Sequence, residues 1–304
     1  MTSTHTHTLE RDGALLAYDV HDPAGPLAPD PGRPPLLLVG SPMSAEGFTS
    51  LRAHFPDRVV VTYDPRGAGR STLDPAVTAT TPQDHAADVA AVLDALGLAQ
   101  VQAFGSSGGA VNLLALVTAR PELVSTLVAH EPPMAAFLPD RELWLEVNTE
   151  LGATYRREGF GPATAAFITY VSIQGPITAE HLAAPAPDPA AFGLGTDDDG
   201  TRRDPLFGLN NASCVPYEPD LEALRAAPTR VLVACGVESR QGFTGRAAAG
   251  LAEAMGSELV VFPSHHAGFL GGEFGQQGEP EAFAARLREV LEGSAADQGQ
   301  PEPV

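Results

Sequence analysis

The sequence has little positive charge and no lysine. Its 304 residues include 18 basic residues, all of them arginine, against 38 acidic residues, which gives a formal net charge of −20. Nucleic acids and anionic membranes bind through basic faces that displace counterions. We therefore expect neither as a partner, and the excess of acidic residues favours solubility.

Long apolar runs and clustered cysteines are also missing. The longest apolar runs are PPLLLV (34–39) and RVLVAC (230–235), well short of the roughly 20 residues that cross a bilayer. The N-terminal stretch MTSTHTHTLERDG lacks the basic and apolar regions of a secretory signal, so cytoplasmic localisation is expected. Cys214 and Cys235 cannot build a disulfide framework and lie in no metal-binding pattern, so no metal site is expected.

Short aliphatic runs alternate with helical patterns along most of the chain. Continuous apolar runs of this length are typical of strands buried on both faces, and their alternation with helices of 10–15 residues favours βαβ units. We predict an α/β protein with a mostly parallel central sheet flanked by helices, preceded by a strand pair at 7–13 and 14–20. The other expected strands are 35–40, 58–64, 100–105, 125–131, 229–236 and 257–263, and the expected core helices are 84–98, 109–123, 245–256 and 279–293.

The segment 134–219 has a different character. Helical patterns at 141–159 and 162–175 are followed by the loop-like stretch APAPDPAAFGLGTDDDGTRRDP, and no run resembles a strand. We interpret 134–219 as a helical cap inserted into a core made of residues 1–133 and 220–293. The last residues, 294–304, are expected to form a disordered tail.

The stretch VQAFGSSGGAVNLL (101–114) carries the candidate chemistry. Gly105, Ser107 and Gly109 satisfy the motif G-x-S-x-G, whereas Ser106 is off its centre. The motif alone is weak, but here it follows an expected strand and opens an expected helix, which is the setting that exposes a nucleophilic serine at the carboxyl end of a sheet. Ser107 is the candidate nucleophile, and the alternative is a glycine-rich tight turn without chemistry.

Three other segments flank this turn in a consistent order: PLLLVGSPMSAEGF (35–48), YDPRGAGRST (63–72) and SHHAGF (264–269). They resemble segments of the α/β-hydrolase superfamily, namely its apolar strand followed by H-G-x-P, its D-x-R-G-x-G-x-S segment and its histidine loop. The resemblance covers nearly the whole chain. It implies the α/β-hydrolase fold with a helical cap.

A serine hydroxyl needs a base, and the base needs an acid that orients it. The resemblance places His266 as the base, with His265 as the less favoured alternative. The superfamily's usual acid position is Ser239 in this chain, which cannot serve. Two carboxylates remain: Glu131, placed as in the haloalkane-dehalogenase-like branch that RPELVSTLVAHEPP resembles, and Glu238, next to the usual position. We favour Glu131 and keep Glu238 as the alternative.

An oxyanion hole requires backbone N–H groups directed at the developing negative charge. Gly108, which follows the candidate nucleophile, should supply one. If VGSP aligns with H-G-x-P, Ser41 supplies the other, since a shift by one residue would select Pro42, which has no N–H. Val39 then replaces the usual histidine. The expected substrate pocket includes Met43, Ser106, His130, Phe137, Trp144 and His265.

A serine nucleophile suits acyl transfer, whereas the dehalogenases and epoxide hydrolases of the superfamily use aspartate. No P-loop, zinc triplet or dinucleotide motif occurs in the sequence, so no cofactor is expected. We predict a hydrolase that cleaves a small or medium apolar carboxylic ester or lactone through an acyl-enzyme on Ser107. The alternatives are a cofactor-independent non-hydrolytic enzyme (a perhydrolase of the haloperoxidase type, a C–C lyase or a biosynthetic cyclase) and a ligand-binding receptor. The partner is a small-molecule substrate, and the sequence gives no signal for an oligomeric state.

Overall fold

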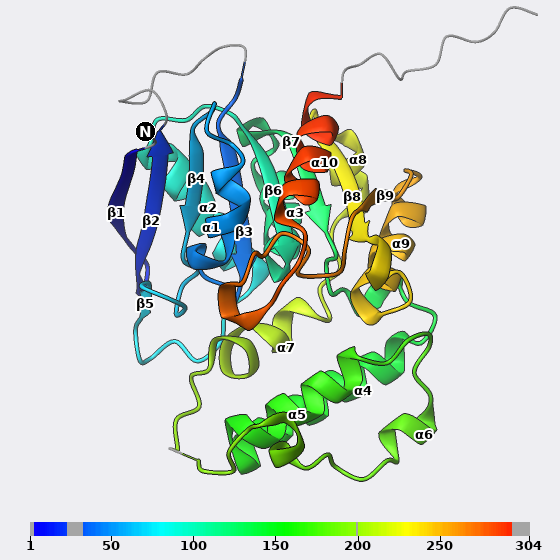
Figure 1. Ribbon diagram of the computed structural model, residues 1–304. Helices are drawn as coiled ribbons and strands as arrows, with labels where there is room; N and C mark the ends of the chain where they lie inside the picture. The colour runs from blue at the N-terminus through cyan, green and yellow to red at the C-terminus, as the bar shows by residue number, and fades with distance from the viewer. Residues whose placement is uncertain (1–2, 23–32, 199, 294–304) are drawn as a thin grey trace, which may run out of the picture.

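The computed structural model describes residues 3–22, 33–198 and 200–293 and is built around one sheet (Figure 1). The strand order is β1-β2-β4-β3-β6-β7-β8-β9, with β5 paired to β2. The pairings β1–β2, β2–β4 and β2–β5 are antiparallel and all others are parallel. The strands are β1 (Ser3–Arg11), β2 (Ala14–Asp22), β3 (Leu36–Ser41), β4 (Val60–Tyr63), β5 (Thr72–Leu73), β6 (Val101–Ser107), β7 (Val124–His130), β8 (Arg230–Gly236) and β9 (Val260–Phe262).

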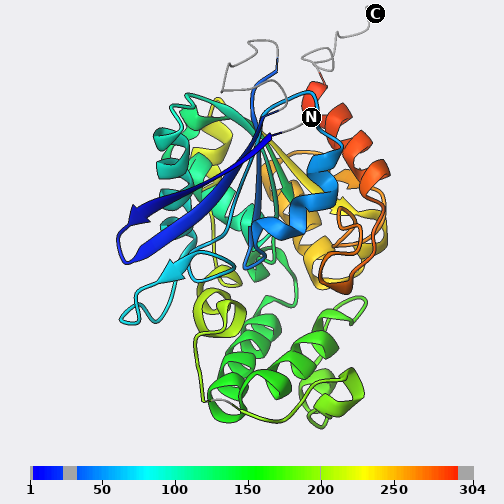
Figure 2. The same cartoon turned by 60° about the vertical axis from the view of Figure 1, so that its left-hand side comes forward.

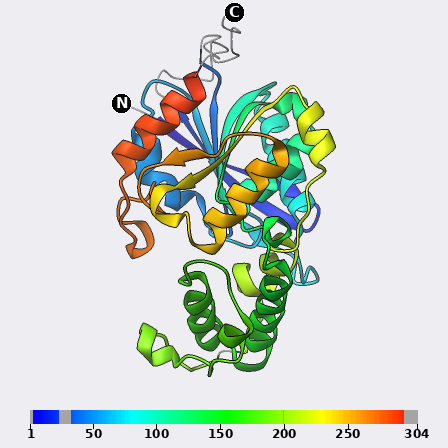
Figure 3. The same ribbon diagram turned by 90° about the vertical axis from the view of Figure 1, so that its right-hand side faces the viewer.

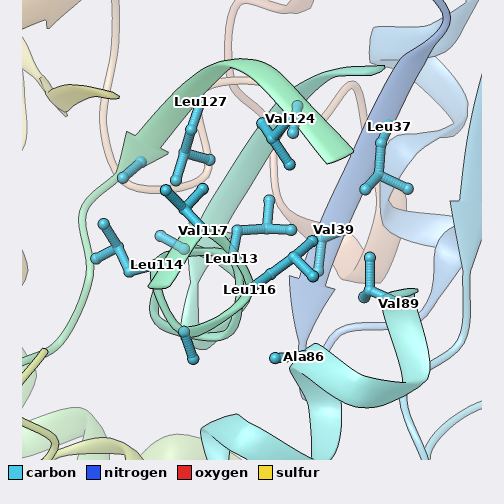
Figure 4. Close-up of a cluster of buried hydrophobic side chains, with 14 of the residues drawn as sticks. Leu37, Val39, Ala86, Val89, Leu113, Leu114, Leu116, Val117, Val124 and Leu127 are labelled. Carbon is cyan, nitrogen blue, oxygen red and sulfur yellow. The ribbon is translucent and has the colours of Figure 1, made fainter. Parts of the chain in front are cut away.

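The central strands are apolar on both faces because helices cover both. In β3, Leu37 and Val39 pack into one hydrophobic cluster, while Leu36 and Leu38 pack into another on the opposite face. This alternation follows from the two-residue period of a strand. Figure 4 shows part of the first cluster, where Leu113, Leu116 and Val117 of α3 pack near the strands. The sheet is therefore the middle layer of three, as expected from its continuous apolar runs.

The helices α2, α3, α8 and α9 contribute side chains to the first cluster, and α1 and α10 contribute to the second. Figure 3 shows the two helical layers flanking the sheet. Thr81 caps α2 in a capping box with Asp84, with Pro82 in the first turn, so the helix begins two residues before the predicted 84. The core helices are α1 (Thr49–Ala53), α2 (Pro82–Ala95), α3 (Gly108–Ala119), α8 (Leu221–Ala226), α9 (Phe243–Met255) and α10 (Pro280–Glu292).

Between β7 and β8 the chain forms a separate helical layer. Figures 1 and 2 show α4, α5 and α6 below the sheet, with α7 between them and the core. The layer has its own hydrophobic cluster, which includes Trp144, Val147 and Leu151 of α4 and reaches Phe243 of α9. Its elements are α4 (Arg141–Glu158), α5 (Phe160–Val171), α6 (Ala179–Leu182), the short helix Pro205–Asn210 and α7 (Asn211–Cys214).

The predicted fold class is confirmed: the protein is α/β with a mostly parallel sheet flanked by helices. Every predicted strand and core helix occurs, with ends that differ by a few residues. The two-residue strand β5 was not predicted, because Thr72–Leu73 is too short to show a periodicity. The proposed tail 294–304 lies outside the described residues.

Candidate active site

The end of β6 and the start of α3 form a tight turn at Ser107. The backbone of Ser107 has φ 57° and ψ −130°, a conformation that non-glycine residues rarely adopt and that costs on the order of 1–3 kcal/mol. The flanking residues must be small. A Cβ on Gly105 would lie 2.8 Å from the Gly109 carbonyl oxygen, and a Cβ on Gly109 would lie 2.1 Å from that of Val39. The motif therefore reflects the close approach of α3 to the sheet.

Ser107 opens onto a cavity of about 430 Å³ at the carboxyl ends of the strands. Of the predicted site residues, Ser41, Met43, Ser106 and His266 also line it. Residues that the sequence had not singled out complete the wall: Pro42, Ser44, Ala68, Gly69, Asp204, Pro205, Leu206, Ala267, Phe269, Leu270, Phe274 and Gln276.

Glu131 and His266 form an ion pair beside this cavity. Glu131 Oε2 lies 2.6 Å from His266 Nδ1, and the glutamate side chain is completely buried. The same oxygen accepts a hydrogen bond from Thr244 Oγ1 at 2.6 Å, and Oε1 accepts one from the Gly236 N–H at 2.8 Å. The carboxylate is thus held by donors from β8, α9 and the histidine loop, as a buried charge requires.

The pair fixes the protonation of both groups. Burial opposes the charge on Glu131, but the charge and hydrogen bond of His266 outweigh it, with His130 and Thr244 contributing, and lower the pKa of Glu131 below its ordinary value. Burial also opposes charge on His266, but Glu131 raises the pKa of that imidazole above its ordinary value of 6.5. A hydrogen bond to a carboxylate places the proton of neutral His266 on Nδ1 and leaves Nε2 as a base. Among the hydrogen bonds of the described residues, none joins Ser107 Oγ to His266, which is common in structures without substrate.

The second carboxylate considered from the sequence is not brought to the histidine. Glu238 lies in the short helix Val237–Ser239 and its side chain is exposed. Glu131 instead follows β7 directly with φ 50°, a left-handed backbone, and its long side chain reaches across to the N–H of Gly236 at the end of β8.

The two predicted oxyanion residues lie next to each other. Ser41 is opposite Ser107 in the β3–β6 pairing, and a Cβ on Gly108 would lie 2.6 Å from the Ser41 carbonyl oxygen. The segment after Ser41 is anchored by Asp64, whose Oδ1 accepts the Ala45 N–H at 2.8 Å. Asp64 belongs to the D-x-R-G-x-G-x-S segment, so that segment supports the loop beside the serine.

Unusual backbone conformations gather at the site. Four non-glycine residues among those described have positive φ. Two are Ser107 and Glu131, and the third, Ser264, begins the loop that carries His266. The fourth, Phe274, lines the cavity. Strain of this kind persists where the surrounding structure enforces it, and it is characteristic of functional sites.

Four predicted pocket residues lie away from the cavity, which corrects the sequence-based expectation. His130 is completely buried, beneath Ser106. Trp144 stacks on Phe243 with ring centroids 4.0 Å apart and lines a separate, smaller cavity of about 60 Å³. Phe137 packs against the core beside α9. His265 turns toward the Gln277 carbonyl oxygen, 3.1 Å from its Nε2.

Two of the residues that the sequence analysis did not name make specific contacts at the site. Thr244 is the second residue of α9 and binds Glu131, and a single threonine at a helix start gives no signal of a partner in another element. Asp204 lies in the stretch interpreted as a loop, where Asp204-Pro205 is a helix-start pattern that could have been recognised. Its Oδ1 accepts the N–H groups of Leu206 and Phe207 at 3.0 and 2.9 Å.

The described ranges lack two other kinds of feature. No group of three or more His, Cys, Asp or Glu side chains there could hold a metal ion. Over the same residues, no helix has both the length and the apolar character needed to cross a membrane.

Known proteins match both the sequence and the fold. The family described as alpha/beta hydrolase fold matches residues 34–169. The uncharacterized hydrolase YraK of Bacillus subtilis is 27% identical over 292 residues, which cover 94% of this chain and 95% of that protein. The protein has the α/β-hydrolase fold, and residues 34–169 carry the match to that family.

Two other matches are more distant or more local. The solved structure of the carboxylesterase CesB from Bacillus subtilis has the same fold, with a TM-score of 0.63 and 18% identity, covering 96% of this chain and 93% of CesB. A proline iminopeptidase of Xylella fastidiosa is 39% identical over 98 residues, which are 32% of this chain and 31% of that protein. That second similarity is confined to about a third of either protein.

Proposed function

We propose that this protein is a serine hydrolase that cleaves a small or medium uncharged carboxylic ester or lactone. The observation that carries the proposal is the hydrogen bond from buried Glu131 to His266, beside the cavity that Ser107 and His266 both line. One structural neighbour, CesB, is a carboxylesterase, which is consistent with the proposal. The overall similarity to that neighbour speaks for the fold alone.

In the proposed mechanism, His266 Nε2 takes the proton of Ser107 as its Oγ forms a bond to the substrate carbonyl carbon. Glu131 stabilises the resulting imidazolium, and the N–H groups of Ser41 and Gly108 stabilise the oxyanion. The C–O bond to the alcohol then breaks, and the departing oxygen takes the proton from His266. Water activated by the same imidazole hydrolyses the acyl-serine, which releases the acid and restores the hydroxyl.

The cavity wall favours uncharged substrates. Its ionisable side chains are His266 and Asp204, and no arginine is among the lining residues. A carboxylate without a compensating cation repels an anionic substrate, especially where water is partly excluded. The volume of about 430 Å³ lies within the range of small-molecule sites. A short acyl or alkoxy group beside Leu206, Phe269 and Leu270 fits this surface.

The test combines a fluorophosphonate probe with p-nitrophenyl esters from acetate to hexanoate. We expect one probe adduct per chain, mapped to Ser107, and ester turnover that Ser107→Ala abolishes. Ser172→Ala is the matched control, since Ser172 is an exposed serine on the cap and should leave labelling and turnover unchanged. Turnover of the natural substrate that survived Ser107→Ala would instead favour the non-hydrolytic chemistry considered above.

A second candidate is hydrolysis of an amide beside a free amino group, and Asp204 is the observation that favours it. One carboxylate oxygen caps the helix Pro205–Asn210, while the residue lines the cavity. The local similarity to proline iminopeptidases points the same way. To test this candidate, two substrates are compared: L-prolyl p-nitroanilide should be cleaved, and its N-acetyl derivative should not. Asp204→Asn, which still caps a helix, should remove that preference.

A further inference from the structure

A second histidine lies against the Glu131 carboxylate. His130 Nε2 is 3.7 Å from Glu131 Oε1, the oxygen that is not bonded to His266, and the two imidazole rings are stacked with centroids 6.2 Å apart. Its other ring nitrogen, Nδ1, is 3.2 Å from Ser106 Oγ. Within the described residues Nε2 has no hydrogen-bond partner, and the ring is completely buried. Four aromatic rings enclose it, those of Phe104, Phe262, Phe269 and Phe283.

The buried, apolar surroundings of His130 determine whether its ring is charged. Burial lowers the pKa of His130 to about 4, against the attraction of Glu131, so the ring is neutral near pH 7. The other titratable groups that interact with Glu131 are His266 and Cys235. Burial, together with Glu131, raises the pKa of the Cys235 thiol to about 11, so it too is uncharged near neutral pH.

The neighbours of the neutral ring also decide which nitrogen carries its proton. A proton on Nδ1 would direct the Nε2 lone pair at the ionised Oε1, which is repulsive. A proton on Nε2 instead directs an N–H at the carboxylate and leaves Nδ1 to accept the Ser106 hydroxyl. At 3.7 Å the Nε2–H interaction is longer than a hydrogen bond, so it acts as an oriented dipole in a buried, apolar surrounding.

We propose that His130 is a positioning residue that stabilises ionised Glu131 at Oε1, the oxygen not bonded to His266, with Ser106 holding it in the Nε2–H tautomer. This inference rests on the proposed function, in which Glu131 orients His266. The positive end of the His130 dipole faces Glu131, and through it the His266 imidazolium. It therefore offsets part of the effect by which Glu131 raises the pKa of His266, and keeps the base deprotonated closer to neutral pH.

Ser106 then has a defined task distinct from that of Ser107. In this tautomer the Ser106 hydroxyl donates its hydrogen bond to His130 Nδ1, while Ser106 also lines the substrate cavity. In this proposal Ser106 acts on Glu131 through His130, whereas Ser107 passes its proton to His266, which bonds the other carboxylate oxygen. Threonine at position 106 keeps the hydroxyl, and alanine removes it.

The first test is the pH dependence of kcat/KM for a p-nitrophenyl ester, measured on full-length protein. We expect His130→Phe, which preserves a ring among the aromatic side chains, to move the acid limb up by about 0.5 to 1 pH unit and to lower kcat about tenfold. Ser106→Ala should move the limb in the same direction, and Ser106→Thr should restore it. His54→Gln, at the end of α1 beside Arg288 of α10, is the control. A folded His130→Phe protein with an unmoved acid limb would overturn the proposal.

The second test needs no turnover. The ¹⁵N chemical shifts of selectively labelled histidines report the tautomer of His130 and the titration of His266. We expect a protonated Nε2 and an unprotonated Nδ1 on His130 in the wild type, and a higher His266 pKa in Ser106→Ala. A protonated Nδ1 contradicts the inference, whether or not His130→Phe folds. If these shifts are found and no ester is cleaved, the proposed function fails while the role of His130 toward Glu131 stands.

Discussion

His266 Nδ1 and Glu131 Oε2 lie 2.6 Å apart, although 135 residues separate them in the sequence. The glutamate follows β7 and the histidine follows β9, and β8 separates these strands in the sheet. The gap is bridged because the Glu131 side chain passes the end of β8, where the Gly236 N–H binds Oε1. These contacts fix the orientation of the carboxylate before any substrate enters.

Removing this charge should disable the base. In Glu131→Gln, the side chain no longer stabilises an imidazolium, and an amide N–H can face Nδ1 and favour the wrong tautomer. We expect kcat on p-nitrophenyl butyrate to fall by about 10³- to 10⁴-fold. Glu238→Gln is the matched control, since Glu238 is exposed, and its activity should equal the wild type. A larger loss in Glu238→Gln than in Glu131→Gln would assign the acid to Glu238.

The pH profile should show the pair directly. Glu131 raises the pKa of His266 above 6.5, and the base works only when neutral, so activity is lost as the pH falls through that raised pKa. The acid limb of kcat/KM should therefore have its midpoint above 6.5 in the wild type and lower in Glu131→Gln. A wild-type midpoint below 6.5 would contradict the coupling. The residual activity of Glu131→Gln must be measured with enough enzyme to define its limb.

Thr244 should matter through its hydroxyl. Its Oγ1 donates to Glu131 Oε2 at 2.6 Å, and a hydrogen bond to a buried charged group contributes about 1.5 to 3 kcal/mol. Thr244→Val should lower the free energy of unfolding by about that amount and reduce kcat, as the carboxylate loses one of its anchors. Thr244→Ser keeps the hydroxyl and should retain most of the wild-type free energy of unfolding and most of kcat. Equal urea midpoints for the valine and serine variants would show that the bond is unimportant.

The serine turn was predictable from sequence because it is local. The strand, the G-x-S-x-G turn and the helix lie within about twenty residues, and the small residues are required by the approach of α3 to Val39. Prediction of the oxyanion pair also depended on a local constraint, that Pro42 has no N–H. The candidate acid was harder to predict from the sequence. Its choice between Glu131 and Glu238 depends on the reach of a side chain past the end of β8, which no local pattern encodes.

The cap was the least predictable region. Helical periodicity identified α4 and α5, but it did not indicate which apolar side chains would face the cavity. Trp144 was expected there and instead packs on Phe243, because α4 docks against α9. Asp204 was missed because its segment is rich in glycine, proline and aspartate and has no periodicity. Only packing between distant segments places these two residues.

Close backbone approach also predicts an asymmetry between two glycines. A Cβ on Gly109 would meet the Val39 carbonyl oxygen at 2.1 Å, whereas a Cβ on Gly152 would meet only the far end of the Arg156 side chain, at 3.3 Å. Gly109→Ala should destabilise the fold by more than about 4 kcal/mol. Gly152→Ala, within α4, should stabilise it by up to about 1 kcal/mol. Thermal unfolding of both variants measures the contrast, and a Gly109→Ala protein of wild-type stability would contradict the tight turn.

The attachment of the cap to the core should depend on one ion pair. Arg246 of α9 binds both oxygens of Asp140, at 2.5 and 3.1 Å, and also the Gly175 carbonyl oxygen at 3.0 Å. Asp140 precedes α4 and accepts the Ile177 N–H, so the pair links two segments of the cap, Asp140 and the loop 175–177, to a core helix. Both side chains are largely buried, at 13% and 7% exposure, and removing one partner of such a pair leaves a poorly solvated charge.

We therefore expect Arg246→Met and Asp140→Asn each to lower the free energy of unfolding by about 2 to 4 kcal/mol. The double variant should lose less than the sum of the two, because it leaves no unpaired charge. Hydrogen exchange should accelerate across 141–182 while β6 and β7 stay protected, and KM should rise more than kcat falls. Additive losses, or exchange that accelerates equally in cap and sheet, would mean that the pair contributes to general stability and does not specifically hold the cap.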